Sequence, residues 1–187
     1  TGVCTLYNRL DNEEKSLEVW SSYNAPVDLP SRDIPIGHIC YEATIKSKDK
    51  IVNLGNLAGT EFEQSDPNVK KYGLKAYLGY PVTVNENTIG ALCVVDTKIR
   101  EFNKTELYII ATLAKAVSIE EERIFSDRAL KESERRFDLA LRSTDDGLWD
   151  WTAGSDEVFL SPRWKQMLGY SDDEVLSLDD PFPNLIH

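Results

Sequence analysis

The stretch that most constrains the fold is a pair of apolar runs within residues 80–96, separated by three polar residues. Asn85, Glu86 and Asn87 are typical of a hairpin turn, because they tolerate tight or left-handed backbone conformations. Gly90 has no side chain, so we expect a packed helix or a ligand to approach the backbone closely there. Both faces of the second run are apolar, which predicts a strand covered on both sides. One face carries Ile89, Ala91, Cys93 and Val95, and the other Leu92 and Val94.

The sequence of these two runs is also similar to that of a known domain family. They resemble the final hairpin of a GAF domain, the small-molecule sensing module of many bacterial signalling proteins, in Tyr77-Leu78-Gly79-Tyr80-Pro81-Val82 and Ile89-Gly90-Ala91-Leu92-Cys93-Val94-Val95-Asp96. The helix start at residues 102–106 fits the same pattern. The resemblance implies an α+β fold, an antiparallel sheet flanked by helices, over residues 1–118. The alternative is an unrelated antiparallel hairpin packed on a helix.

A long helix is predicted directly after the hairpin. Asn103 can cap its first turn, Glu106 can return a hydrogen bond to the cap, and Phe102 can pack on Leu107. Residues 119–136 are mostly charged, with opposite charges four residues apart, which favours a solvated connector helix. An apolar stripe that should face the sheet precedes them at Leu107, Ile110, Ala111, Ala114 and Val117.

The connector is also the predicted site of self-association. It lacks proline and glycine, so we expect one nearly continuous helix from Asn103 to about Phe137. A second copy would cover its scattered apolar side chains, giving a parallel homodimer through the connector helix. Heptad spacing of Ile110, Val117 and Ile124 indicates a weak seam. The alternative is a solvated spacer helix in a monomer. The side chains that need cover are Ile119, Ile124, Phe125 and Leu130.

Residues 137–187 carry a second resemblance. They closely resemble the first half of a PAS domain, in Asp146-Gly147-Leu148-Trp149-Asp150-Trp151 and Val158-Phe159-Leu160-Ser161-Pro162-Arg163-Trp164. The resemblance implies two strands around a turn at residues 153–156, followed by a helix. Ser161 is a suitable cap for this helix, Pro162 occupies a position that needs no N–H, and Gly169 can end it in a left-handed conformation. We therefore expect a fragment of a longer sensor protein.

Composition narrows the class of protein. The formal charge of −11 and the lack of a basic run argue against a nucleic-acid partner or an anionic membrane surface. No apolar run is long enough to span a bilayer. Three widely spaced cysteines predict neither a disulfide framework nor a metal site, and we expect reduced thiols in a cytoplasmic protein. The sequence opens in an apparent strand without the helix that usually precedes it in GAF domains, so we expect that Thr1 is not a natural start.

The first eighty residues predict short elements joined by loops. Prolines at 26, 30 and 35 predict a loop that continues to about Ile36. Residues 54–72 mix glycine, asparagine, acid and proline, which is typical of a long mobile or functional loop. The predicted elements are strands at 3–7, 17–20 and 51–54, a helix at 36–46, and a helical turn at 67–71.

The GAF resemblance implies a ligand pocket under residues 54–72. Its segments offer aromatic side chains, glycine and asparagine but no basic pair, so we expect a small ligand held by shape and backbone groups. The alternative is that the aromatic side chains form only a core. The candidate pocket residues are Tyr41, Leu54, Phe62, Tyr72, Tyr77 and Leu78.

No catalytic residue is predicted in this segment. Nucleophilic catalysis needs a cysteine or serine beside a base, and only two histidines are present. His38 and Cys40 are two apart on a predicted helix, so their side chains diverge, and we interpret His38 as a surface residue. A different class of function is a GAF-fold redox enzyme acting through Cys40 or Cys93, which requires an accessible thiol of low pKa.

The cofactor stays unknown. Asp33-Ile34-Pro35 resembles a motif of the bilin-binding GAF domains of phytochromes, but those use a cysteine usually followed by histidine, and here the order is His38-Ile39-Cys40. Covalent bilin is therefore not supported. The cyclic-nucleotide signature of GAF domains and the flavin-reactive Asn-Cys-Arg motif are also missing, and flavin and metal are not supported.

Together these patterns predict the signal-input region of a bacterial signal-transduction protein. A small ligand or a partner would bias the connector helix and a downstream output domain, with a histidine kinase favoured. The alternatives are the input region of a diguanylate cyclase or phosphodiesterase, the redox enzyme above, and a GAF domain that serves only for dimerisation.

Overall fold

The computed structural model describes residues 2–11, 13–47, 50–144, 146–151 and 158–171. The chain divides into two compact units, Thr1–Phe125 and Ser126–His187, and each is described by itself.

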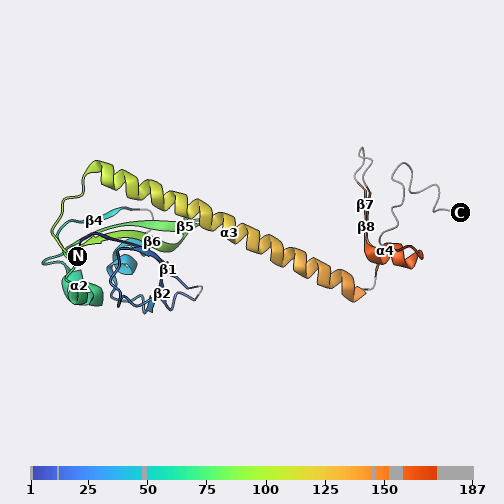
Figure 1. Ribbon diagram of the computed structural model, residues 1–187, viewed down its shortest axis with the longest axis horizontal. Helices are drawn as coiled ribbons and strands as arrows, with labels where there is room; N and C mark the ends of the chain where they lie inside the picture. The colour runs from blue at the N-terminus through green and yellow to red at the C-terminus, as the bar shows by residue number, and fades with distance from the viewer. Residues whose placement is uncertain (1, 12, 48–49, 145, 152–157, 172–187) are drawn as a thin grey trace. The chain divides into compact units, whose positions relative to one another are not determined.

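The first unit is built on a six-stranded antiparallel sheet, which confirms the α+β expectation (Figure 1). The order across the sheet is β3-β2-β1-β6-β5-β4, so the predicted hairpin and β1 form its centre. A two-residue strand lies in the segment that the prolines predicted to be loop throughout. The strands are β1 (Cys4–Leu10), β2 (Leu17–Tyr23), β3 (Arg32–Asp33), β4 (Val52–Leu54), β5 (Ala76–Val84) and β6 (Asn87–Asp96).

The hairpin of β5 and β6 turns through two residues. Asn85 and Glu86 have φ angles of 48° and 66°, and Val84 pairs with Asn87. Positive φ at both central residues gives a type I′ turn, whose twist matches that of the flanking strands. Asn87, expected in the turn, is instead the first residue of β6.

A β-bulge changes the expected side-chain pattern of β6. The register shifts between Val82 and Thr83 of β5, and Ile89 of β6 is the extra residue opposite them. Ile89 therefore turns away from Ala91 and packs with Leu92. The prediction that Ile89 shares a face with Ala91 is wrong, because a bulge interrupts the two-residue alternation.

Gly90 allows a close approach, but by a neighbouring strand and not by a helix or ligand. It pairs with Arg9 of β1. A Cβ at Gly90 would lie 2.3 Å from the backbone oxygen of Asn8, so any side chain would push β1 and β6 apart.

Two hydrophobic clusters cover the two faces of the sheet, as predicted for a strand apolar on both sides. On the η1 face, buried residues include Cys4, Leu10, Leu17, Ile39, Cys40, Ile45, Leu57, Val69, Tyr77, Ala91, Cys93 and Val95. On the α3 face they are Tyr7, Ala76, Leu78, Val82, Leu92, Phe102, Ile110 and Ala114.

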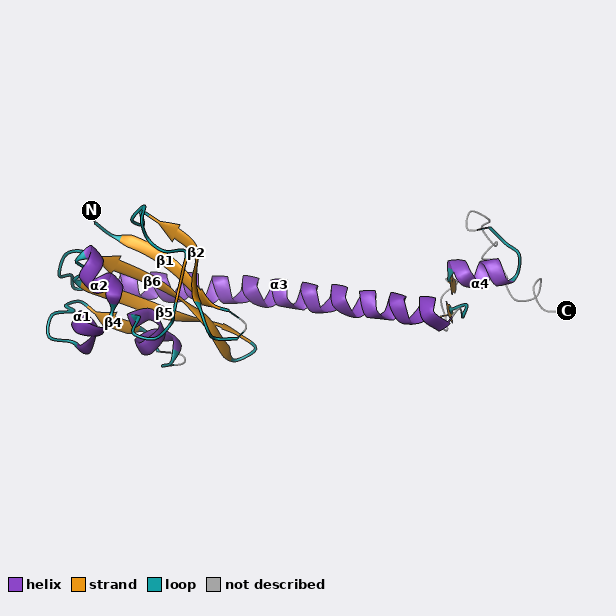
Figure 2. Cartoon of the chain, turned by 90° about the horizontal axis from the view of Figure 1, so that it is seen from below, coloured by secondary structure: helices purple, strands orange, loops and turns teal. Residues whose placement is uncertain are grey.

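Three short helices lie over the η1 face: the π-helix η1 (Cys40–Ile45), α1 (Glu61–Ser65) and α2 (Pro67–Tyr72) (Figure 2). The predicted helix at 36–46 begins later, and Ile36 lies outside it, 73% exposed. The predicted turn at 67–71 is confirmed as α2, whereas α1 was not predicted. Asp66 caps α2 by accepting hydrogen bonds from the backbone N–H groups of Asn68 and Val69.

The long helix α3 (Lys104–Thr144) begins as its capping residues predict. The side chain of Asn103 accepts from the backbone N–H groups of Thr105 and Glu106 at 2.9 and 3.0 Å. Glu106 in return accepts from the backbone N–H of Asn103 at 2.8 Å. Phe102 and Leu107 both pack in the cluster of the α3 face. This reciprocal box fixes the start of the helix from local sequence alone.

The apolar stripe of α3 lies on the sheet as predicted. Ile110 and Ala114 are 3% and 0% exposed, and Val117 packs beside them. Because the sheet already covers Ile110 and Val117, the heptad that joins them to Ile124 is wrong as an intermolecular seam.

The second unit holds a short hairpin and a helix among its described residues. β7 (Trp149–Trp151) pairs antiparallel with β8 (Val158–Leu160), and α4 (Pro162–Met167) follows. The Ser161 side chain accepts from the backbone N–H of Trp164, and Gly169 has a φ of 87°, as predicted for the two ends. The predicted turn at 153–156 lies outside the described residues.

Candidate functional site

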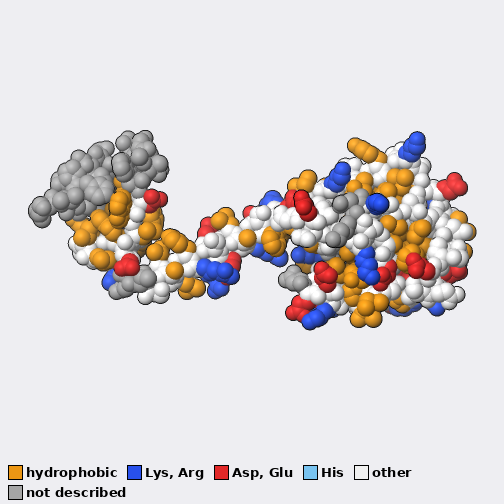
Figure 3. Space-filling model, turned by 180° about the vertical axis from the view of Figure 1, so that it is seen from behind, with side chains coloured by type: hydrophobic (Ala, Val, Ile, Leu, Met, Phe, Trp, Pro, Cys, Tyr) orange, Lys and Arg blue, Asp and Glu red, His pale blue; other side chains and the backbone are white. Residues whose placement is uncertain are grey.

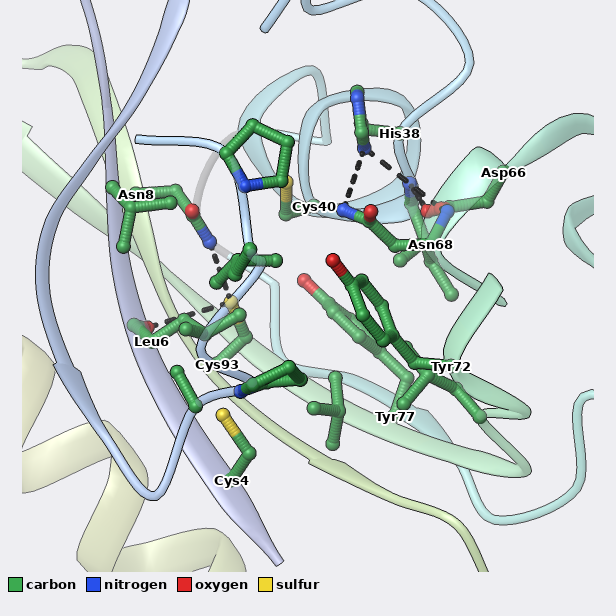
Figure 4. A pocket seen from close by; sticks show the side chains of 18 of the residues that line it. Cys4, Leu6, Asn8, His38, Cys40, Asp66, Asn68, Tyr72, Tyr77 and Cys93 are labelled. Atoms are coloured by element: carbon green, nitrogen blue, oxygen red, sulfur yellow. Dashed lines mark hydrogen bonds and ion pairs between the residues drawn. The ribbon is translucent and has the colours of Figure 1, made fainter. Parts of the chain in front are cut away.

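A cavity of about 400 Å³ lies on the η1 face of the sheet (Figure 4). Strands β1, β2, β5 and β6 form one side of it, and η1, α2 and the loop at residues 24–30 the others. Its volume lies in the range of small-molecule sites. Most of its lining is apolar: Cys4, Leu6, Leu17, Val19, Ala25, Pro26, Val27, Leu29, Pro30, Ile39, Cys40, Leu74, Cys93 and Val95.

Tyr77 is the residue that β5 contributes to the cavity wall among the described residues. Its side chain is 1% exposed, and its hydroxyl lies 2.7 Å from the hydroxyl of Thr44 in η1. Gly79 makes this contact possible, because a Cβ there would lie 2.3 Å from the Tyr77 hydroxyl. The absence of a side chain at Gly79 therefore leaves the space in which Tyr77 contacts η1.

The six predicted pocket residues take three different positions. Tyr72 and Tyr77 line the cavity. Three others, Tyr41, Leu54 and Phe62, pack against the cluster of the η1 face but do not line the cavity.

Leu78 lies on the opposite face of the sheet, in the cluster beneath α3. Adjacent residues of a strand point to opposite faces, so Tyr77 and Leu78 could not both line one cavity. The loop at residues 24–30 was not predicted to line the cavity. Its apolar residues between prolines were the available signal.

His38 was predicted at the surface and is instead 3% exposed, in the cavity wall. Its Nε2 atom lies 3.3 Å from an Asp33 carboxylate oxygen, and its Nδ1 atom lies 3.5 Å from the Asn68 amide and 3.8 Å from Asp66. Asp66 also accepts a hydrogen bond of 2.7 Å from the backbone N–H of Ile39. The prediction failed because the fold brings Asp33, five residues earlier, and Asp66 and Asn68, at the start of α2, around the imidazole.

The three cysteines all line this cavity as free thiols. Cys93 accepts a hydrogen bond of 3.1 Å from the Asn8 amide and donates one of 3.5 Å to the backbone oxygen of Leu6 (Figure 4). Burial raises the pKa of Cys93 to about 12 and also raises the pKa values of Cys4 and Cys40. These thiols stay protonated near neutral pH, whereas a nucleophilic cysteine needs a lowered pKa.

The comparison with protein families rests on the same unit. The family model of the GAF domain matches residues 1–120, which include the whole sheet and the cavity. The chain belongs to the GAF domain family. The resemblance of the β5–β6 hairpin to that family is therefore confirmed.

A curated relative is the hybrid signal transduction histidine kinase A of Dictyostelium discoideum, 27% identical over 130 residues. The match covers 67% of this chain and 6% of that protein, so the chain spans only a small part of its relative.

Solved GAF domains share the fold. The blue-light absorbing form of the PixJ GAF domain of Thermosynechococcus elongatus superposes with a TM-score of 0.55 at 15% identity, over 71% of this chain and 82% of that one. The GAF domain of an Acinetobacter phosphoenolpyruvate-protein phosphotransferase gives 0.51 at 21% identity, over 62% and 68%.

On the other face of the GAF sheet, β1 contacts α3 through a buried polar group. The Tyr7 hydroxyl donates a hydrogen bond of 2.8 Å to Glu121, and the Arg9 guanidinium lies 3.0 Å from the same carboxylate. Glu121 is only 6% exposed. Burial, and then the hydrogen bond to Glu121, raise the pKa of Tyr7. The Arg9 guanidinium also lies 4.8 Å from the ring centre of Trp20.

Two further hydrogen bonds hold the same part of α3. The backbone N–H of Thr83, at the bulge, donates to the Ser118 hydroxyl at 2.9 Å, and that of Asn85 donates to Glu122 at 3.3 Å. The GAF domain thus holds α3 by polar contacts with β1 and with the end of the β5–β6 hairpin.

No group of three or more histidine, cysteine, aspartate or glutamate side chains in the described residues could hold a metal ion. Within the same residues, no helix is long and apolar enough to cross a membrane. Lysine and arginine side chains are scattered on the face that Figure 3 presents.

Proposed function

We propose that this chain is the cytoplasmic signal-input region of a signal-transduction protein whose GAF cavity binds a small ligand and whose long helix relays occupancy. The favoured output is a histidine kinase, which the kinase relative supports. A cyclic-dinucleotide synthase or hydrolase is the alternative. The buried free cysteines are consistent with a reducing compartment, and the hairpin and helix of the second unit are consistent with a PAS-like half-domain.

The observation that carries the proposal is the double role of β1. Cys4, Leu6 and Asn8 line the cavity, while Tyr7 and Arg9, on the other face of the same strand, contact Glu121. A ligand that shifts β1 would therefore change the contacts of α3 directly. Signalling requires only that the ligand favours one of two arrangements of this contact.

We also propose that these residues catalyse no reaction on their own. The redox alternative through Cys40 or Cys93 is disfavoured by two observations. Both thiols are buried, and burial raises the pKa of each. Methionine sulfoxide reduction or ATP hydrolysis by purified 1–187 that disappears in Cys40→Ala or Cys93→Ala would overturn this proposal.

The partner we propose is a second copy of the chain, bound along the outward face of α3. Ile109 and Ile119 are 49% and 68% exposed on this face. They belong to a repeat with alternating steps of three and four residues, which consists of Ile109, Thr112, Ala116, Ile119, Arg123, Ser126, Leu130, Ser133 and Phe137. A repeat of alternating three and four residues fits a partner helix of the same kind. In a parallel pair, Lys115 of one copy would lie across from Glu120 of the other.

Photo-crosslinking tests this seam without disturbing the buried cysteines. Benzoylphenylalanine at Ile119 should give a cross-linked dimer, while the same residue at Phe125, which is 57% exposed on another side of α3, should not. A monomeric mass by light scattering at high concentration, with no cross-link at Ile119, would contradict the dimer.

Native mass spectrometry of freshly purified protein tests the ligand site. Ala25→Phe places a ring in the cavity, and Ala58→Phe adds the same ring at an exposed position that does not line it. We expect a small molecule, either co-purified or found by fragment screening, to bind the wild type and Ala58→Phe but not Ala25→Phe. Binding that Ala25→Phe leaves unchanged, or no binding by any compound of the screen, would contradict a ligand site here.

A further inference from the structure

The cavity wall is acidic, and no lysine or arginine side chain among the described lining residues balances its carboxylates. Asp33, Asp66 and His38 are the acidic and imidazole groups of its wall, and neither lysine nor arginine occurs among the described residues that line it. The other polar groups of the wall are amides and hydroxyls, which bind either sign of charge weakly. They belong to Asn8, Asn24, Asn68, Tyr72, Tyr77 and Thr97.

The two carboxylates have different surroundings. Asp66 is 2% exposed and accepts hydrogen bonds from the backbone N–H groups of Ile39, Asn68 and Val69 at 2.7, 2.7 and 3.2 Å. These hydrogen bonds cap α2 and tie it to η1, which makes Asp66 a structural group. Asp33 accepts one backbone hydrogen bond, from Ile34, and its side chain is 41% exposed at the cavity wall.

His38 adds an independent sign of a missing partner. Its side chain is 4% exposed, and its Nε2 atom has no hydrogen-bond partner in the described part of the chain. The 3.3 Å contact with Asp33 brings the two groups together without the geometry of a hydrogen bond. Buried polar atoms normally have a partner, so a polar group is expected beside Asp33 and His38 when the cavity is filled.

We infer that the cavity takes a small cationic ligand, an organic ammonium or comparable protonated nitrogen on an apolar body. The inference rests on the proposed ligand site. Two carboxylates and one imidazole face this site and no lysine or arginine lines it, so an anion would enter a site that already holds groups of like charge. The ammonium would lie at Asp33, and its apolar body against Leu6, Leu17 and Val95.

Three probes with the same phenyl ring and similar size separate the charge classes. Isothermal titration calorimetry of protein 1–187 with 2-phenylethylamine, 2-phenylethanol and phenylacetate compares a cation, a neutral molecule and an anion. We expect the amine to bind at least about tenfold more tightly than the alcohol, as charge-assisted hydrogen bonds do. We expect phenylacetate to bind more weakly than either. Equal binding of amine and alcohol, or stronger binding of phenylacetate, would overturn the inference.

Asp33→Asn and Asp28→Asn form a matched pair of variants. Asp28 is exposed, pairs with Lys71 and does not line the cavity. Asp33→Asn should remove the preference for the amine and leave the alcohol unchanged, whereas Asp28→Asn should change neither, with circular dichroism as the folding control. A preference that survives Asp33→Asn, or no amine binding by the wild type, overturns the inference. The proposed function would still stand if the alcohol or phenylacetate bound wild type and not Ala25→Phe.

Discussion

The two faces of the GAF sheet are filled in different ways. Against the α3 face, a single long helix packs its apolar stripe closely, and Ala76, Val82 and Ala114 are all fully buried. Against the η1 face, three short helices and a proline-rich loop leave a cavity of about 400 Å³. The same strands form both faces, so the difference comes from the segments that cover them.

One strand of this sheet, β1, serves both faces. In β1, alternate side chains point to opposite faces, so Leu6 and Asn8 reach the cavity while Tyr7 and Arg9 reach α3. A close-packed face transmits displacement, because dense interiors deform little. The η1 face contains the cavity, and what fills the cavity can change. We therefore expect substitutions on the two faces to have different consequences.

The largest difference should come from the same truncation on each face. Ile110→Ala on the α3 face should lower the free energy of unfolding by about 2–5 kcal/mol, because dense packing around it cannot collapse into the gap. Ile39→Ala on the η1 face should cost at least about 1 kcal/mol less, because its side chain already borders a cavity. Urea unfolding measures both. Equal losses would contradict the contrast between the faces.

The next effect concerns the polar contact between β1 and α3. Glu121→Ala should destabilise the domain by about 1–3 kcal/mol, since it leaves the Tyr7 hydroxyl without its partner. A double-mutant cycle of Tyr7→Phe with Glu121→Ala should give a coupling energy of about 0.5–3 kcal/mol. Glu120→Gln, at an exposed pair with Arg123, is the control and should change little. Additive losses from Tyr7→Phe and Glu121→Ala would show that the contact carries no energy.

A third prediction concerns the Cys93 thiol, which lines the cavity on the η1 face. The pKa of Cys93 is raised to about 12 in the fold from an ordinary value of 9.0, so above pH 9 the unfolded chain loses a proton that the folded chain keeps. The contribution of this thiol to stability is complete below pH 9 and should fall by about 1.4 kcal/mol per pH unit up to about 12. Unfolding at pH 8 and pH 10.5 should therefore show that the stability difference between wild type and Cys93→Ala becomes smaller at the higher pH. A difference that stays constant would mean that the thiol is accessible to solvent.

The smallest effect is expected at the helix start. Asn103→Ala should cost about 1 kcal/mol, because two backbone N–H groups of α3 lose their acceptor. Asn103→Asp should keep most of that stability. Thermal unfolding of the three proteins is the measurement, and equal melting temperatures for wild type and Asn103→Ala would contradict a role for this cap.

What could be predicted from sequence was local. The Asn103 cap, the apolar stripe at Ile110 and the hairpin turn each depend on residues close together in the chain. The pocket depends on which face a side chain takes and on which distant segment covers it. Leu78 was misplaced because it neighbours Tyr77 on one strand, and His38 because Asp33 and Asp66 surround it only in the fold.

Hydrogen exchange, measured by mass spectrometry, tests the central claim that β1 couples the cavity to α3. The comparison uses protein 1–187 with and without a compound that binds the wild type but not Ala25→Phe. We predict that the compound changes exchange both in β1 and in residues 117–125 of α3. In Glu121→Ala the change in β1 should remain while that in α3 is lost. A change confined to β1 in the wild type would contradict the account.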